Sequence, residues 1–384
     1  MMHFIYNKSP KEEHLTWLDG VRGIASIWVM LSHIQILTGL APIPILSWGW
    51  LAVDVFMMLS GFLMAHHYIL RQHKEPWQHP KTVFYFWLRR FFRIAPLYYL
   101  LLAVALLAGP LLGEFRADIA TIWPLTATPP QRYTDSSISN IIMHLTFAFG
   151  LSPFYAFHTA LPDWSIGLEM QFYLAFPFIM WLFMVSGPVI STILLMIVCG
   201  GVQYLWPNYW SSFEMPAFLL MKLPIFLIGI LIACGKNNGE MKRYLLYTLL
   251  LVMGLHFVHP IKLGWQDLTL AILMFYLTGS KELPGSSIFH PIFSWLRQLF
   301  ACRLAVFLGA TSYSVYLLHL MVVIPVAGYL STMHSYLMLN QYLRFIVVVV
   351  LVTPVVYAIA WLLYNKIELL GIKIGKWLIA SVSA

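Results

Sequence analysis

Charged residues are scarce in this sequence. Asp, Glu, Lys and Arg make up 10% of its 384 residues, whereas a soluble globular domain carries about 25%. Hydrophobic residues make up 60% of the chain, and the mean hydropathy is +0.77. This composition excludes an ordinary water-soluble domain and indicates a polytopic membrane protein, in which lipid replaces part of a conventional buried core.

Cysteine is scarce as well, because only Cys199, Cys234 and Cys302 occur. Their spacing matches neither a CxxC pair nor a metal site, so we expect three small apolar residues and no disulfide. No H-E-x-x-H motif occurs, and we expect no metal. The net charge of +8 comes from basic residues in short loops beside apolar segments. That placement is typical of cytoplasmic membrane edges, so we expect no nucleic acid partner.

The apolar segments predict an all-α bundle of about ten membrane-spanning helices, because a helix needs about 20 apolar residues to cross the hydrocarbon core. The predicted spans are 16–38, 49–70, 94–112, 162–185, 188–205, 215–234, 244–258, 264–279, 304–328 and 342–364. Residues 138–150 are apolar but too few to span easily, and we expect a re-entrant or interfacial helix there. We expect one integral-membrane domain over residues 1–384, with neither a cleaved signal peptide nor an appended soluble domain.

The distribution of basic residues tests this arrangement. With ten spans, 18 of the 23 Lys and Arg residues fall on the side of the N-terminus. Cytoplasmic loops carry such an excess, so we expect both termini in the cytoplasm and a multi-pass protein of the inner membrane. The five basic residues on the outer side are Arg116, Arg132, Lys222, Lys262 and Arg344.

The first predicted helix contains "RGIASIWVMLSHI", in which Arg22 and His33 stand eleven residues apart. Eleven steps of 100° end about 20° from three full turns, so the two side chains share one face, about 16 Å apart along the axis. Asp19 and Ser26 lie on that face too. No other Lys or Arg precedes a histidine at this spacing. Charged groups inside a membrane are expensive, so we expect a functional stripe, although helix packing also explains single polar residues.

Two further predicted helices carry carboxylates. Asp54 lies near the outer edge of the second, at a depth similar to His33. In "PDWSIGLEMQFYLAFP", Ser165, Glu169 and Tyr173 recur at intervals of four residues and share one face. A buried carboxylate must be protonated or paired with a cation, and we expect Glu169 to pair with His33. For Asp54, contact with interfacial water is the alternative.

Residues 84–93 read "FYFWLRRFFR" and predict a basic, aromatic-rich helix lying in the membrane plane. The guanidinium groups of Arg89, Arg90 and Arg93 suit phosphate oxygens. Anchoring to lipid headgroups is the alternative, and the two roles can coexist.

Two later helices carry further polar residues. Lys222 lies in "MKLPIFLIGILIACG", where its ammonium group either takes part in a site or reaches the outer edge. In "GATSYSVYLLHL", Ser312, Tyr316 and His319 share one face at i, i+4 and i+7. They form either part of a site or a hydrogen-bond cluster between packed helices.

Six stretches together resemble the acyltransferase family 3 membrane proteins. In order, they are "LDGVRGIASIWVMLSH", "VDVFMMLSGFLM", "RRFFRIAPLYYL", "WSIGLEMQFYLAFP", "KLPIFLIGILIA" and "GATSYSVYLLH". By this resemblance Arg22 and His33 match a basic-x10-His motif, and Arg90 and Arg93 match an R-x-x-R motif. Glu169 matches the acidic position of the WS-x-x-x-E stretch, while Lys222 stands where the family more often has arginine.

The resemblance implies a ten-helix enzyme that uses acyl-CoA to O-acylate envelope glycans. We expect acetyl-CoA as the donor and a hydroxyl of lipopolysaccharide O-antigen, exopolysaccharide or a similar outer-side glycan as the acceptor. The CoA phosphates would bind Arg22, Arg89, Arg90 and Arg93 at the inner edge, and the pantetheine arm would extend through the lipid-embedded bundle to His33.

The role of His33 stays open between two mechanisms. It acts either as a general base on the acceptor hydroxyl or as a covalent acyl carrier. Glu169 or Asp54 would orient its ring, as a carboxylate does in a catalytic triad. The residues predict no particular oligomeric state.

Two other classes of protein fit parts of this pattern. A transporter or flippase for a glycan or lipid-linked precursor also lines a cavity with intramembrane charges, often within repeated halves. The sequence shows no such repeat, and the single basic-x10-His spacing argues against this class. A scaffold in a glycan-export complex is the third class, and it would tolerate alanine at His33.

Overall fold

The computed structural model describes residues 15–257 and 264–383. Within these ranges the regular elements are all helical, which confirms the all-α prediction. The longer helices are α1 (Thr16–Leu37), α2 (Gly49–Arg71), α3 (Pro80–Ile122), α6 (Trp164–Leu205), α8 (Leu219–Asn238), α9 (Met241–Phe257), α10 (Trp265–Gly279), α11 (Ser286–Phe300), α13 (Ser312–Ser331), α15 (Gln341–Leu363) and α16 (Leu369–Ser383). The short ones are η2 (Pro124–Thr126), α4 (Gln131–Thr134), α5 (Ile138–Leu145), η3 (Ala148–Leu151), α7 (Pro207–Ser211), α12 (Arg303–Ala310), α14 (His334–Leu337) and η4 (Tyr364–Glu368).

Each predicted span coincides with a helix, but not one to one. Among the described residues, seven helices are long and apolar enough to cross a membrane, or eight if the bent pair α11 and α12 forms one span. α6 covers two predicted spans and breaks at Gly187, whose φ of 76° and ψ of 164° are not helical. α9 and α10 have only 17 and 15 residues. The number ten therefore stays a prediction.

Residues 84–93 are helical, as predicted, and form the first part of α3, a single helix of 43 residues that continues through Pro96 and Pro110. Their position in the membrane plane stays a prediction. Proline is tolerated inside membrane helices when neighbouring groups satisfy the freed carbonyls. Residues 138–150 do form short helices, α5 and η3, as predicted, and their position relative to the membrane stays a prediction.

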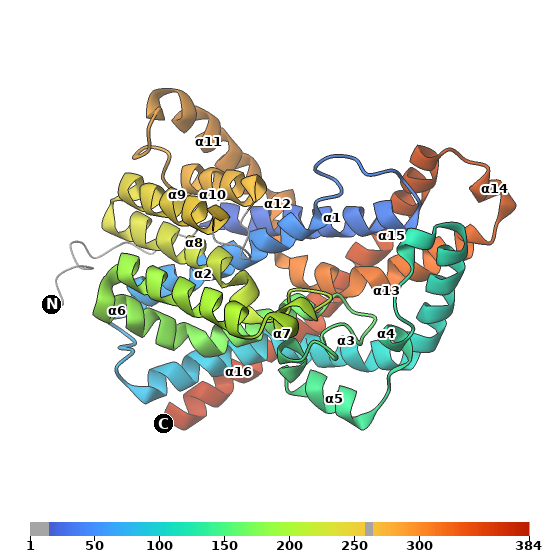
Figure 1. Ribbon diagram of the computed structural model, residues 1–384, viewed down its shortest axis with the longest axis horizontal. Helices are drawn as coiled ribbons and strands as arrows, with labels where there is room; N and C mark the ends of the chain where they lie inside the picture. The colour runs from blue at the N-terminus through green and yellow to red at the C-terminus, as the bar shows by residue number, and fades with distance from the viewer. Residues whose placement is uncertain (1–14, 258–263, 384) are drawn as a thin grey trace.

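α1 packs against α2, α12 and α13, and α13 packs against α3 and α15. Figure 1 shows α1 and α13 crossing the middle of the molecule, with the start of α1 and the end of α16 toward its left side. This central packing brings polar side chains from distant parts of the sequence together. The cytoplasmic location of both termini stays a prediction.

Reporter fusions test that location. We expect reporters fused at both ends of the chain to show cytoplasmic activity, because the basic residues concentrate on that side of the predicted arrangement. Substituted-cysteine labelling at exposed Arg303 should give the same side. An outer location for one terminus alone would contradict an even number of spans.

Glycines allow α2 and α8 to pack with their backbones in contact. A Cβ at Gly61 would lie 2.1 Å from the carbonyl oxygen of Phe226, and one at Gly229 would lie 2.1 Å from that of Met58. We expect Gly61→Ala to lower stability by about 1–3 kcal/mol because the helices must separate. The measurement is the fraction of protein surviving heating in detergent. Gly200→Ala, where an added Cβ meets nothing within 4 Å, is the matched control and should behave like wild type.

Candidate active site

Two histidines from distant helices form a hydrogen-bonded pair. Nδ1 of His33, on α1, lies 3.0 Å from Nε2 of His319, on α13. The ring centres are 5.0 Å apart, and the rings are inclined by 38°. His319 is fully buried, and His33 is half-buried. The sequence singled out both residues separately but predicted a carboxylate as the partner of His33.

Backbone carbonyls determine which ring nitrogens carry protons. Nδ1 of His319 lies 2.7 Å from the carbonyl oxygen of Tyr316 and 3.2 Å from that of Val315. Because carbonyls only accept, this Nδ1 carries the proton, and Nε2 of neutral His319 is an acceptor. It accepts from Nδ1–H of His33, which also lies 3.0 Å from the carbonyl oxygen of Val29. Neutral His33 therefore has its free lone pair on Nε2, where a base or nucleophile needs it.

A pocket opens between α1, α2, α6 and α13, with about 490 Å³ of atom-free space that includes the part open to solvent. Its lining includes five of the residues that the sequence singled out, together with Ser60 and Tyr313. The five are Arg22, Ser165, Glu169, Ser312 and Tyr316.

Tyr316 connects this pocket to the histidine pair. Its hydroxyl lies 2.8 Å from Oγ of Ser165, and its ring centre lies 6.2 Å from that of His319. Ser312 lines the pocket while its hydroxyl donates to the carbonyl oxygen of Gly309. The polar face predicted for this helix thus continues from the pocket to the buried histidine.

Glu169 does not contact His33, so the predicted pairing is wrong. Its Oε1 accepts hydrogen bonds from Oγ of Ser60, at 2.8 Å, and from the hydroxyl of Tyr173. It lines the same pocket as Arg22. The physical reason is depth, because His33 lies about 16 Å beyond Arg22 along α1. Glu169 therefore acts on the Arg22 end of the site.

Asp54 does not orient His33 either. Its fully buried carboxylate forms an ion pair with Nζ of Lys222, with an Oδ1–Nζ distance of 2.8 Å and an Oδ2–Nζ distance of 2.9 Å. The ammonium group also lies 5.7 Å from the ring centre of Trp50. Removing one partner of such a pair leaves an uncompensated charge, so the pair couples α2 to α8. The ammonium group of Lys222 therefore forms an ion pair inside the protein.

The basic residues at the start of α3 have different partners. Arg89 forms two hydrogen bonds with Glu75, at 2.8 and 3.2 Å. The guanidinium group of Arg90 lies 5.7 Å from the ring centre of Phe86 and 5.8 Å from that of Tyr173, and its Nε is buried without a hydrogen-bond partner. Arg90 therefore adjoins the pocket through Tyr173, whereas Arg89 already has an anionic partner.

Glu368 is not among the residues that the sequence singled out. It lies in η4, a π-helical turn, and its buried carboxylate accepts a hydrogen bond from Ser314. π-turns occur frequently at functional sites, and the only signal in the sequence was a single Glu in the basic stretch "NKIELLGIK". Asp19 lies in the first turn of α1, where a carboxylate is favourable.

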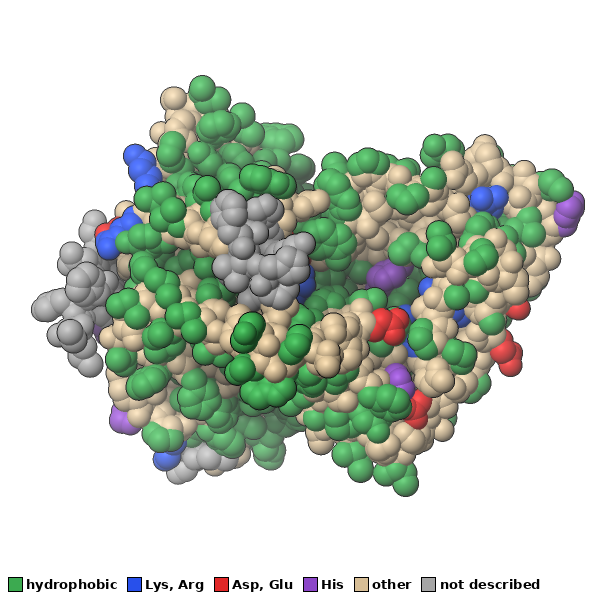
Figure 2. Space-filling view, in the orientation of Figure 1, with side chains coloured by type: hydrophobic (Ala, Val, Ile, Leu, Met, Phe, Trp, Pro, Cys, Tyr) green, Lys and Arg blue, Asp and Glu red, His purple; other side chains and the backbone are tan. Residues whose placement is uncertain are grey.

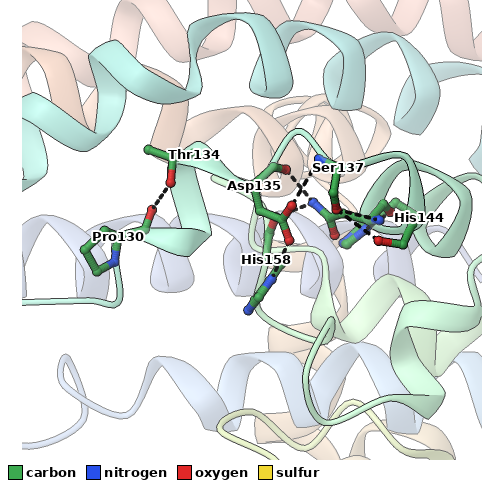
Figure 3. A network of polar contacts seen from close by, with 8 residues as sticks. Pro130, Thr134, Asp135, Ser137, His144 and His158 are labelled. Carbon is green, nitrogen blue, oxygen red and sulfur yellow. Dashed lines mark hydrogen bonds and ion pairs between the residues drawn. The ribbon is translucent and has the colours of Figure 1, made fainter.

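A polar network holds the segment between α4 and α6. Figure 3 shows Asp135 facing His158, and their Oδ2 and Nδ1 atoms are 2.9 Å apart. The side chain of Asn140 donates to the carbonyl oxygens of both. Nδ1 of His144 lies 2.9 Å from the carbonyl oxygen of Asn140. Sequence periodicity could not predict this network, because most of its members lie in loops and a short helix.

The same network reaches the start of α6. Nε2 of His144 lies 3.6 Å from Oδ2 of Asp163, which also accepts hydrogen bonds from Thr159 and Tyr98. Burial lowers the pKa of His144 and raises the pKa of Asp163, so it disfavours charge on both groups. This arrangement holds the first turn of α6, which carries Ser165 and, one turn later, Glu169.

Comparison with known proteins identifies the family. The model of a family described as an acyltransferase domain, acyltransferase family 3, matches residues 15–365. The chain belongs to this family.

Three curated relatives carry related names. The chain is 37% identical over 103 residues to protein 2 in the picA locus of Rhizobium radiobacter, covering 27% of this chain and 48% of the relative. It is 35% identical over 159 residues to a provisionally named membrane-bound transacylase of Komagataeibacter xylinus, covering 41% and 34%. It is 24% identical over 374 residues to a provisionally named O-acetyltransferase of Staphylococcus aureus strain COL, covering 86% and 53%. The chain thus spans about half the length of these relatives or less, and no solved structure gives a significant match.

Proposed function

We propose that this membrane acyltransferase moves an acetyl group from cytoplasmic acetyl-CoA to a hydroxyl of an envelope glycan such as lipopolysaccharide O-antigen or exopolysaccharide. The observation that carries the proposal is the arrangement along α1. Arg22 lines a pocket at one end, and His33, paired with His319, presents a free Nε2 about 16 Å further on.

The inner arginines bind the donor in this proposal. Arg22, Arg90 and Arg93 supply guanidinium groups for the CoA phosphates, and Arg90 adjoins the pocket through Tyr173. Arg89 contributes less, because Glu75 already occupies it. The pantetheine arm is long, thin and uncharged at its reactive end, so it can pass through the pocket toward the histidine pair.

His33 then assists the transfer. The acceptor hydroxyl oxygen attacks the thioester carbonyl carbon while Nε2 of His33 takes the hydroxyl proton. The C–S bond breaks, and the leaving thiolate receives that proton from His33. During this step, Nε2 of His319 and the carbonyl oxygen of Val29 stabilise the Nδ1–H of the imidazolium. The same Nε2 lone pair would serve an acyl-histidine intermediate, so the tautomer supports either route.

The test uses the purified full chain in nanodiscs with acetyl-CoA labelled in the acetyl group. We expect labelled product with an added envelope glycan extract, and slow release of labelled acetate without it. A transporter or flippase would consume no acetyl-CoA. Intact acetyl-CoA after incubation with folded protein and glycan would contradict the proposal.

The R-x-x-R arginines provide a second prediction. We expect Arg93→Ala to raise the KM for acetyl-CoA about tenfold, since a charge-assisted phosphate contact is worth roughly 1.5–3 kcal/mol. Arg93→Lys should recover only part of that loss, because a point charge replaces a planar fork. The matched comparison is Arg89→Ala, which removes one charge from the same helix and should have a smaller effect. Unchanged affinity in the Arg90→Ala, Arg93→Ala double variant would identify these residues as lipid anchors.

A further inference from the structure

Two arginines lie at the far end of the site from the proposed donor-binding residues. Arg116 is on α3, 23 residues beyond Arg93 and therefore about 35 Å further along the helix. Arg132 is in α4, which packs against α3. Nε of Arg132 donates to the segment that leads into α6, and the first turn of α6 contacts Tyr316, three residues before His319. The predicted topology places both arginines on the outer side.

Arg132 is buried with only part of its guanidinium group engaged. Its exposed fraction is 7%. Nε donates to the carbonyl oxygen of Thr159 at 3.0 Å, and the guanidinium carbon lies 3.9 Å from the ring centre of Phe157. These contacts hold the group in one orientation. Its two terminal nitrogens have no hydrogen-bond partner among the described residues.

Arg116 is engaged even less. Within the described part of the chain its side chain forms no hydrogen bond or ion pair, and its Nε is buried without a partner. Asp163 is a candidate carboxylate partner for Arg132, because Thr159 accepts from Arg132 through its carbonyl oxygen and donates to Asp163 through its hydroxyl. However, Oδ2 of Asp163 accepts from Thr159 and Tyr98, and no ion pair with Arg132 forms.

Arg132 is buried and Arg116 is half-buried, and burying a cation without an anion beside it is costly. This cost is recovered when a ligand supplies the anion. Figure 2 shows a hollow in the right half of this face, where Figure 1 places α4 and α13, with a histidine and Lys or Arg side chains visible inside. The hollow provides the access that such a ligand needs.

We propose that Arg116 and Arg132 form an anion site beside His33, which binds a carboxylate or phosphate of the acyl acceptor. The acceptor is then an acidic glycan or a sugar carried on a lipid phosphate. This inference rests on the proposed function and specifies its acceptor. Guanidinium groups suit both anions, and holding the anion there would place a neighbouring sugar hydroxyl at Nε2 of His33. The CoA phosphates are excluded as its ligand, because they bind at the other end of α3 in the proposed arrangement.

The test measures binding to the purified full chain in nanodiscs without acyl-CoA. The probes are sodium glucuronate, glucose 1-phosphate and neutral methyl glucoside, at equal ionic strength. We expect at least one anionic sugar to raise the midpoint of thermal unfolding and methyl glucoside to leave it unchanged. A response to glucuronate alone identifies a sugar acid, and a response to glucose 1-phosphate alone identifies a sugar phosphate.

Variants locate the site. Arg132→Gln and Arg116→Gln should each remove most of the shift. Arg116→Gln breaks no hydrogen bond among the described residues, so it carries the test if Arg132→Gln fails to fold. Lys373→Gln, which removes an exposed charge, and His33→Ala should both keep the shift.

Two outcomes overturn the inference. One is that neither anion stabilises the protein more than methyl glucoside, and the other is that the shift survives in Arg116→Gln. Neither outcome affects the proposed function, which is tested separately by acetyl-CoA turnover. Conversely, the protein could show the shift in unfolding midpoint but no acetyl-CoA turnover. That result would contradict the proposed acyl transfer and support the anion site.

Discussion

His33→Gln is expected to reduce acyl transfer about 10²- to 10⁴-fold, the usual contribution of a general base. Glutamine keeps the approximate size and some hydrogen bonding but cannot take up a proton at neutral pH. His33→Ala should be at least as inactive. Binding of acetyl-CoA should persist in both variants, because the pocket at Arg22 lies about 16 Å away along α1. The measurement is the transfer rate per folded protein, with the acetyl-CoA dissociation constant determined in parallel.

A histidine that serves only helix packing would give a different result. Gln would then be tolerated, and Ala would reduce the amount of folded protein while the rate per molecule stayed near wild type. His334→Gln is the matched control, since this histidine lies exposed in α14. Activity near wild type in His33→Gln would remove His33 from the chemistry.

His319→Leu is expected to lower kcat about 10²-fold while the KM for acetyl-CoA stays unchanged. His319 is a positioning residue. Its Nε2 accepts a hydrogen bond from Nδ1–H of His33, which favours the tautomer of His33 with its free lone pair on Nε2. Leucine fills a similar volume but accepts no hydrogen bond, so only the carbonyl oxygen of Val29 still accepts from Nδ1–H of His33, and the tautomer and the imidazolium are stabilised less. Replacing a buried histidine also leaves the carbonyl oxygen of Tyr316 without its donor. The measurement is kcat and KM with purified protein.

The conservative variant separates positioning from packing. The side-chain oxygen of His319→Gln can accept from His33 Nδ1–H, so this variant should recover part of the lost kcat. A packing role predicts instead that Leu equals or exceeds Gln, because both fill the site and Leu suits a buried position better. Equal kcat in the two variants and wild type would show that His319 does not act through His33.

Hydropathy predicted the helical architecture well because lipid requires every backbone group to be satisfied within a helix. It also separated the predicted spans 162–185 and 188–205, and α6 does break between them, at Gly187. It did not predict that the segment before the span 94–112 would join it in one helix, α3, which begins at Pro80. Whether a backbone bends at a given residue depends on what packs beside it, and that information is absent from a single segment.

In the candidate site, the sequence predicted which residues share a face of one helix but not which helices are in contact. Helical periodicity correctly grouped Ser165, Glu169 and Tyr173, because residues on one helix have a fixed angular relation. It could not say which helix faces which, so it assigned Glu169 to His33 when Ser60 is among its partners. The pair of His33 and His319 is 286 residues apart in the sequence and became visible only through the packing of α1 on α13.

Arg116 and Arg132 could not be predicted as a site for another reason. Arg132 is in a four-residue helix within a loop region, where no periodicity indicates a direction. Its burial against Phe157, and its lack of an anionic partner among the described residues, are properties of the folded chain. From the sequence, Arg132 could be predicted only to lie among the basic residues on the outer side.

The most direct test of acyl transfer by His33 is mass spectrometry of surface glycans. The comparison uses cells without the protein, cells with the wild type and cells with His33→Gln at matched membrane levels. The account predicts glycan species heavier by one acetyl group with the wild type alone. The same mass shift in cells carrying His33→Gln, or identical glycans in all three, would contradict it.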